Sequence, residues 1–184
     1  AFSRNSSNNT NMGFSGSLVI PNKVKTIGHY AFNYCTNLKG SLNLPESLTS
    51  IGNYAFYYCS GFTGDLIIPK NVKTIGSYAF YYCTGFNGEL VFPNGLTSIG
   101  SYAFTTNSSS TSMKFTGSLV IPNSVTSIGE RAFYNAGFDG DLILSENLTS
   151  ISNYTFYQCR FKGNLRIPNS VTTIGERAFY NCNY

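Results

Sequence analysis

Residues 65–88 read DLIIPKNVKTIGSYAFYYCTGFNG, and this stretch holds one copy of the pattern that fills the chain. Approximate copies begin at residues 17, 41, 65, 89, 118, 141 and 164. The prolines mark the period, since those at residues 21, 45, 69 and 93 follow one another at intervals of 24. A repeat of this length is typical of a solenoid, in which each unit buries its apolar side against its neighbours.

The pattern within one unit predicts its local structure. The segment x-L-x-I alternates with a period of two, which indicates a strand with Leu66 and Ile68 pointing inward. Pro69 ends that strand because proline has no backbone N–H group. The segment V-x-x-I-G predicts a second short extended piece, and A-F-x-x-C predicts a helical or 3₁₀ turn. We expect the strands of successive turns to pair in parallel, about 4.7–4.9 Å apart.

The whole chain, residues 1–184, is therefore expected to form one mostly β solenoid domain of about seven turns. Residues 1–16 resemble residues 103–117, and we interpret them as a partial repeat that carries an insertion. The two inserted loops, residues 4–12 and 105–114, are expected on one edge of the solenoid. The sequence starts and stops within a unit, which we interpret as a piece of a longer array or a mature product whose leader has been removed.

The composition supports a stacked core and excludes several functions. All 15 Phe residues fall into three recurring positions of the unit, so the high aromatic content of 16% fits a core. A buried Phe contributes up to about 3 kcal/mol of transfer free energy. The net charge of +4 is not gathered into a basic run, which argues against nucleic acid. No apolar run reaches the length of about 18 residues that membrane insertion needs.

The repeated combination IP…IG..AF..C resembles the BspA-like leucine-rich repeat, also described as Treponema-type, over residues 17–184. The resemblance implies a secreted or cell-surface protein with an adhesive or other extracellular protein-binding role. It implies a host or other extracellular protein as partner, such as a matrix protein or a receptor. One unit departs from the pattern, with Ser145, Ser152 and Thr155 in place of Pro, Gly and Ala. That turn is expected to be less regular.

The predicted binding face lies on the first strand of each unit, between the two inward positions. If Leu and Ile point inward, the residue between them points outward, and in five of seven units it is β-branched and apolar. Such a stripe often marks an interaction surface, and it would also permit self-association. The alternative is that β-branched residues simply favour strands. The stripe comprises Val19, Asn43, Ile67, Val91, Val120, Ile143 and Arg166, with Asp65, Glu89 and Asp141 beside it.

Other side chains favour structural roles. Five cysteines, one in each of five units, predict free buried thiols, because their number is odd and their spacing does not fit a zinc site. His29 is expected at a solvent position. Asp65 and Glu89 could form a glycosidase-like carboxylate pair, although neighbouring acids on a solvated face are more common. The tyrosines form columns that either cover the convex side by ring stacking or offer an interface.

The sequence therefore predicts a non-enzymatic protein-binding or adhesion module, with no catalytic residues, cofactor or metal site. A structural spacer that displays other domains is the alternative. An enzyme acting on an extracellular polymer is the third interpretation.

Overall fold

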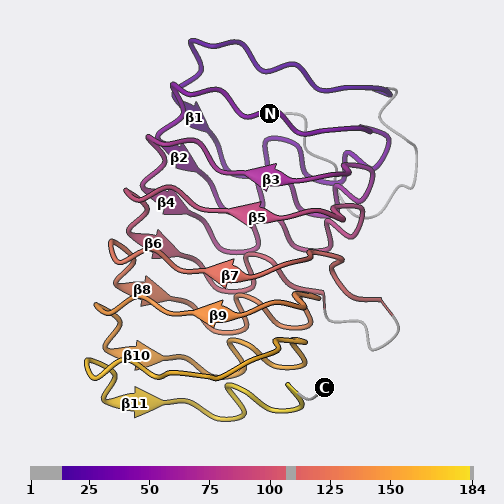
Figure 1. Ribbon diagram of the computed structural model, residues 1–184. Coiled ribbons are helices and arrows are strands. Elements are labelled where there is room, and N and C mark those ends of the chain that lie inside the picture. Colours follow the sequence, from indigo (N-terminus) through magenta and orange to yellow (C-terminus); the bar gives the residue numbers. More distant parts are fainter. Residues whose placement is uncertain (1–13, 107–110, 183–184) are drawn as a thin grey trace.

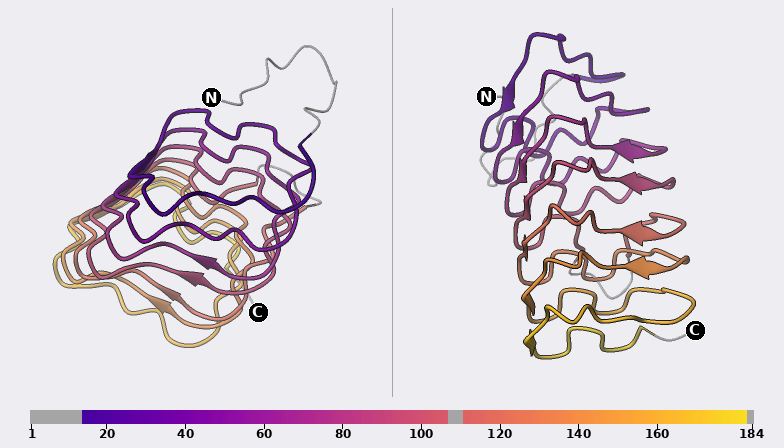
Figure 2. Two further views of the ribbon diagram at one scale, coloured as in Figure 1. Left: turned by 90° about the horizontal axis from the view of Figure 1, so that it is seen from above. Right: turned by 60° about the vertical axis from the view of Figure 1, so that its left-hand side comes forward.

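The computed structural model describes residues 14–106 and 111–182, in which the chain winds through stacked turns as a parallel β-solenoid (Figures 1 and 2). Successive strands of one kind lie beside one another along the stack (Figure 1). The expected inserted loop at residues 4–12 lies outside the described residues, and so does part of the loop at 105–114. The leucine-rich-repeat solenoid predicted from the sequence is the observed fold.

The V-x-x-I-G segment supplies one column of strands. Five of its members form a parallel sheet in the order β1-β2-β4-β6-β8, with Thr26 opposite Ser50 and each later pair one unit further on. β10 and β11 form a separate parallel pair. The bounds are β1 (Thr26–Ile27), β2 (Ser50–Ile51), β4 (Thr74–Ile75), β6 (Ser98–Ile99), β8 (Ser127–Ile128), β10 (Ser150–Ile151) and β11 (Thr173–Ile174). These seven strands bound about six turns, slightly fewer than the seven expected.

The x-L-x-I segment supplies the second column of strands, as predicted. β3 (Leu66–Ile67) pairs in parallel with β5 (Leu90–Val91), and β7 (Leu119–Val120) pairs with β9 (Leu142–Ile143). An isolated parallel bridge between Val19 and Asn43 continues this column toward the N-terminus. In each of these four strands the Leu is buried and the residue that follows it is exposed, which confirms the predicted alternation there. In the last unit Leu165 is 49% exposed, so the inward position that the pattern predicts for it is wrong.

The prediction of helical or 3₁₀ turns at A-F-x-x-C is wrong. No helix occurs in residues 14–106 and 111–182, and so this part of the chain has none long and apolar enough to cross a membrane. Tyr78 and Tyr82 have left-handed backbone angles, with φ of 58° and 59°. Tyr78 N–H donates to Ser101 O at 2.9 Å and Phe80 N–H to Ala103 O at 2.8 Å. A helix would direct these amides along its own axis, whereas here they join one turn to the next.

Two ladders of Phe rings fill the core. The A-F position forms a stack from Phe32 to Phe179, with ring centres 5.1 Å apart at the Phe32–Phe56 step and 5.4 Å apart at the Phe156–Phe179 step. The Phe-x-Gly position forms the second stack, which begins with Phe62 and Phe86 at 6.1 Å. The predicted Phe core is thus confirmed for the inner turns, whereas Phe14 in the first described turn is 55% exposed.

The glycine of the I-G pair lets neighbouring turns approach closely. A Cβ atom on Gly100 would lie 2.4 Å from Ser77 N and 2.5 Å from the carbonyl carbon of Gly76. Ser152 has a side chain at this position, and its Oγ donates to Ile128 O at 2.8 Å. The large sheet ends at β8, just before this turn, and pairing resumes with β10 and β11. The expected irregularity of this turn is therefore a seam in the sheet.

Candidate binding surfaces

The predicted apolar stripe lies on the outside of the β3-β5 and β7-β9 strands. Its apolar members are exposed, from 41% for Val91 to 83% for Val19. Ile67 pairs with Val91, and Val120 pairs with Ile143, so these side chains stand side by side along the stack. Asn43 and Arg166 are exposed as well. The structure thus brings these residues from Val19 to Ile143 onto one surface, which we call the Val/Ile stripe, whereas Arg166 lies in a unit that forms no such strand and in which Leu165 is 49% exposed.

The acidic residues beside the Val/Ile stripe help to join the turns. Asp65 and Glu89 are neighbours, as expected, and Asp65 Oδ1 accepts a hydrogen bond from Glu89 N–H at 2.9 Å. Asp141 N–H donates to Ser118 Oγ at 3.0 Å in the same way. All three acids are exposed. The geometry favours a structural role for Asp65 and leaves the carboxylates on a solvated face.

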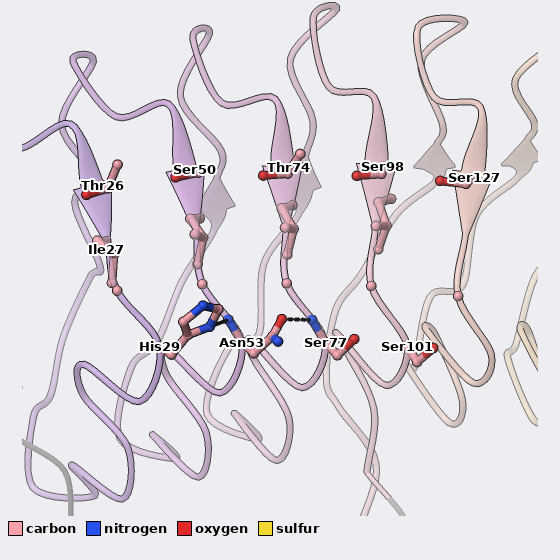
Figure 3. A pocket seen from close by; sticks show the side chains of 18 of the residues that line it. Thr26, Ile27, His29, Ser50, Asn53, Thr74, Ser77, Ser98, Ser101 and Ser127 are labelled. Carbon is pink, nitrogen blue, oxygen red and sulfur yellow. Dashed lines mark hydrogen bonds between the residues drawn. The ribbon is translucent and has the colours of Figure 1, made fainter.

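A second surface is a polar groove of about 690 Å³ along the large sheet. Figure 3 shows a row of hydroxyl groups on the strands and a second polar row just beyond them. His29 Nδ1 accepts a hydrogen bond from Asn53 N–H at 2.9 Å, and Asn53 Oδ1 accepts one from Ser77 N–H at 2.9 Å. His29 is exposed, as predicted. These side chains are engaged with the backbone of the next turn, so they act as rungs between turns.

A third surface consists of stacked aromatic rings on the A-F side of the turns. Tyr30, Tyr54, Tyr78 and Tyr102 form a column with centres 4.6–4.7 Å apart and nearly parallel rings. Arg131 continues this column: its guanidinium lies 5.4 Å from the Tyr102 ring centre and 4.5 Å from that of Tyr154. It also donates a hydrogen bond to Tyr102 Oη. The tyrosine stacking expected from the sequence is therefore present, with arginine inserted.

A second tyrosine column, which we call the inner column, runs beside the first, which we call the outer column, and it is interrupted once. Tyr57 stacks on Tyr81 at 5.0 Å, and Tyr134 stacks on Tyr157 at 4.6 Å. The unit between these two pairs has Thr105 at the corresponding position, and Thr105 is buried. A hollow of about 550 Å³ opens there, and we call it the Tyr–Arg groove. Its lining is Tyr57, Tyr78, Tyr81, Tyr102, Thr105, Arg131, Tyr134, Tyr154, Tyr157 and Arg177.

The repeat pattern by itself does not single out the Tyr–Arg groove. The signal is visible only when the units are aligned, as the replacement of a tyrosine by Thr105 in one column and by Arg131 and Arg177 in the other. Each arginine has an acidic neighbour: Arg131 lies 3.5 Å from Glu130 Oε1, and Arg177 lies 3.6 Å from Glu176 Oε1. The formal charge of these two pairs is zero.

The ionisation of the rings and thiols follows from burial. Partial burial raises the pKa of Tyr78 and Tyr134, and the neighbouring hydroxyls raise it further. These phenols are therefore neutral at physiological pH. The five cysteines are free, as predicted, and four are buried. Burial raises the pKa of the Cys83 thiol, which donates to Phe56 O at 3.0 Å. Within residues 14–106 and 111–182, no cluster of His, Cys, Asp and Glu could hold a metal.

The chain belongs to a known repeat family. The family model described as "BspA type Leucine rich repeat region (6 copies)" matches residues 9–120 and 116–184, which together span most of the chain. The resemblance inferred from the IP…IG..AF..C pattern is thus confirmed. No curated protein matches the sequence.

Two solved structures resemble this one. The first is a leucine-rich repeat protein of T. pallidum, with 28% identity and a TM-score of 0.75 over 90% of this chain and 76% of that one. The second is a leucine-rich cell-surface protein of Faecalibacterium prausnitzii A2-165, with 27% identity and a TM-score of 0.64. That alignment covers 86% of this chain but only 41% of the other. Both structures share their fold with nearly the whole of the present chain.

Proposed function

We propose that this chain is a non-enzymatic protein-binding module of a secreted or cell-surface protein, and that it binds an extracellular protein through the Val/Ile stripe. The observation that carries the proposal is the register of the stripe. Four β-branched side chains, those of Ile67, Val91, Val120 and Ile143, stand exposed on successive parallel turns, and Val19 stands beyond Asn43, with polar groups at their edge. Contiguous exposed apolar surface with a polar rim is typical of protein interfaces.

Burial of the stripe's apolar side chains would supply the free energy of binding. Val19, Ile67 and Ile143 are more than half exposed in the free chain, so covering them with a partner removes apolar area from water. The turns are held by backbone hydrogen bonds, and this surface is therefore already ordered before binding. A preformed surface loses little conformational entropy when a partner docks.

The cell-surface placement is supported by the resemblance to the F. prausnitzii cell-surface protein and by membership of the BspA-type family. Adhesion would be the corresponding biological role, with a matrix protein or receptor as the partner.

The test is an array of extracellular-matrix proteins probed with the wild-type chain and with a double variant, Ile67→Asp and Val91→Asp. We expect the double variant to keep its circular dichroism spectrum and to lose the protein that the wild type captures. The matched control is Thr74→Asp with Ser98→Asp, which places the same charges in the polar groove of β4 and β6. The control should bind like the wild type.

The milder pair Ile67→Ser and Val91→Ser separates binding from folding if the Asp pair unfolds. A folded stripe variant that still captures the partner would overturn the role of the Val/Ile stripe. The spacer function would be favoured by a different pair of results. The wild type would capture no protein on the array, and light scattering would show that the stripe variants no longer self-associate.

A further inference from the structure

We propose that the Tyr–Arg groove is a second binding site and that its ligand is a neutral saccharide. The site shares no residue with the Val/Ile stripe and is independent of the function proposed for it. Three features of the groove carry the inference: an interruption in a column of rings, a mixture of donors and acceptors, and a balance of charge.

The interruption provides the space. Along the inner column, tyrosines stack at 4.6–5.1 Å, so a ring at position 105 would lie between the levels of Tyr81 and Tyr134. Thr105 is much smaller than the ring it replaces, and it is buried at the base of the hollow. The volume of about 550 Å³ lies within the range of small-molecule sites. One or more sugar rings fit a hollow of this size.

The chemistry of the lining matches the two surfaces of a sugar. A pyranose ring has an apolar face of C–H groups and a rim of hydroxyl groups. Tyrosine presents an apolar ring together with a hydroxyl that both donates and accepts hydrogen bonds. The guanidinium of Arg131 has five N–H donors, of which one is used by Tyr102 Oη. Glu176 Oε1 accepts from Tyr154 Oη at 2.8 Å and adds an acceptor at the same edge.

The charges select a neutral ligand. Arg131 and Arg177 are the cationic groups of the lining, and each is paired with the glutamate that precedes it. An anionic ligand would have to compete with Glu130 and Glu176 for these guanidiniums. A neutral polyhydroxyl ligand can accept hydrogen bonds from the arginines and donate to the carboxylates without displacing either pair.

The arginines are accessible to such a ligand. The side chain of Arg131 is 34% exposed and that of Arg177 is 56% exposed. Both are oriented by contacts with the Tyr154 ring, at 4.5 Å and 5.9 Å. A planar guanidinium held against a ring is preorganised for hydrogen bonding, which lowers the entropic cost of binding.

The experiment is titration calorimetry of the folded chain with cellohexaose, mannohexaose, xylohexaose and chitohexaose. A heparin hexasaccharide serves as the anionic probe, and N-acetyl-tyrosinamide serves as a free aromatic ring. We expect at least one neutral hexasaccharide to bind, and neither of the last two probes.

The decisive variant is Thr105→Tyr, which completes the inner column with the residue found in the turns before and after it. It should weaken saccharide binding by about tenfold or more, equivalent to about 1.4 kcal/mol. Arg131→Tyr keeps the outer column stacked while removing the donors, and it should also weaken binding about tenfold. Thr63→Tyr, which makes the same substitution at an exposed position outside the groove, is the matched control and should bind like the wild type.

Several results would overturn the proposal. They are the absence of binding by every neutral hexasaccharide, binding of only the heparin hexasaccharide or N-acetyl-tyrosinamide, and unchanged saccharide binding by both folded groove variants. If Thr105→Tyr does not fold, Arg131→Tyr decides the question. Binding that survives in the Ile67→Asp/Val91→Asp variant separates this site from the Val/Ile stripe.

Discussion

The guanidinium of Arg131 lies 4.5 Å from the centre of the Tyr154 ring and takes the position that a tyrosine holds in five other turns. On its other side it lies 5.4 Å from the Tyr102 ring. A cation over the face of an aromatic ring is attracted by the ring quadrupole. The outer column therefore continues through a turn that has no ring at this position, with a cation between two aromatic faces.

Replacement of Arg131 by alanine should lower the free energy of unfolding by about 1 kcal/mol, because contacts with two rings are lost. Arg131→Tyr should recover most of that loss, since the new ring can stack on both neighbours. Urea denaturation measures both changes. Lys25→Ala, at an exposed position, is the control and should stay within about 0.5 kcal/mol of the wild type. Equal stability of Arg131→Ala and the control would show that the stacked arginine contributes nothing.

Gly100→Ala should destabilise the solenoid by about 1–3 kcal/mol, because the new Cβ meets the backbone of the preceding turn. The distances are 2.4 Å to Ser77 N and 2.5 Å to the carbonyl carbon of Gly76. Gly28 holds the same place in an earlier unit, and a Cβ atom added to it would meet nothing within 4 Å. Gly28→Ala should therefore be neutral or slightly stabilising, and similar melting temperatures for the two variants would contradict the close-approach argument.

Phe104→Ala should cost about 3–5 kcal/mol, in line with other large-to-small changes in a packed core. The Phe104 ring is fully buried and stacks on Phe80 at 5.3 Å and on Phe133 at 5.5 Å. Val120→Ala, which truncates a side chain that is 47% exposed on the Val/Ile stripe, should change the stability by less than about 0.5 kcal/mol. Chemical denaturation of both variants measures the two changes in the free energy of unfolding. A small decrease in the free energy of unfolding for Phe104→Ala would argue against a continuous ring core.

The buried thiols should react slowly in the native chain. Cys83 and Cys159 are fully buried, and desolvation raises the pKa of both, so the reactive thiolate is scarce. Cys182 is only partly buried and should react first. Titration with a chromogenic disulfide at neutral pH should show slow native reaction and rapid reaction of all five thiols in denaturant. Fast native reaction of Cys83 would mean that the turns around it open readily.

The chain should lose stability as the pH rises above about 9. The ordinary pKa is 9.0 for cysteine and 10.0 for tyrosine, and burial raises the pKa of Cys83 and Tyr78 in the folded state. Above pH 9 the unfolded chain releases protons that the native chain retains, so the free energy of unfolding decreases. Melting temperatures measured from pH 7 to 10.5 test this. The pair Cys83→Ala and Cys159→Ala should show a shallower decline, and an unchanged slope would exclude the thiols as its cause.

The stacking of turns could be predicted because a short unit repeats its apolar positions. Leu66 and Ile68 alternate around an exposed Ile67, and this alternation fixes both the strand and the direction of each side chain. The exposure of the Val/Ile stripe follows from the same alternation. The identity of the ligand does not follow from this alternation. A β-branched apolar residue is expected at such a position whether it only favours the strand or also contacts a partner.

The turns at A-F-x-x-C could not be predicted in the same way. Tyr78 and Tyr82 adopt left-handed backbone angles, which tyrosine seldom does in isolation. These angles are stabilised by hydrogen bonds to the next turn, which a pattern read along one unit does not reveal. The Tyr–Arg groove could not be predicted from one unit either, because the gap at Thr105 is recognised only when its unit is stacked between those of Tyr81 and Tyr134.

Ser152 has a mechanical consequence. The large sheet stops at β8 in front of this residue, yet the A-F side continues across it, with Phe133 N–H donating to Thr155 O at 3.0 Å and Asn135 N–H to Tyr157 O at 2.8 Å. The A-F side and the β7-β9 pair are thus joined across this seam by backbone hydrogen bonds, whereas β8 and β10 are joined by side-chain bonds such as that of the Ser152 hydroxyl. Under bending load, the rod should open first between β8 and β10, with the A-F side and the β7-β9 pair acting as the pivot and the last turns swinging as a unit.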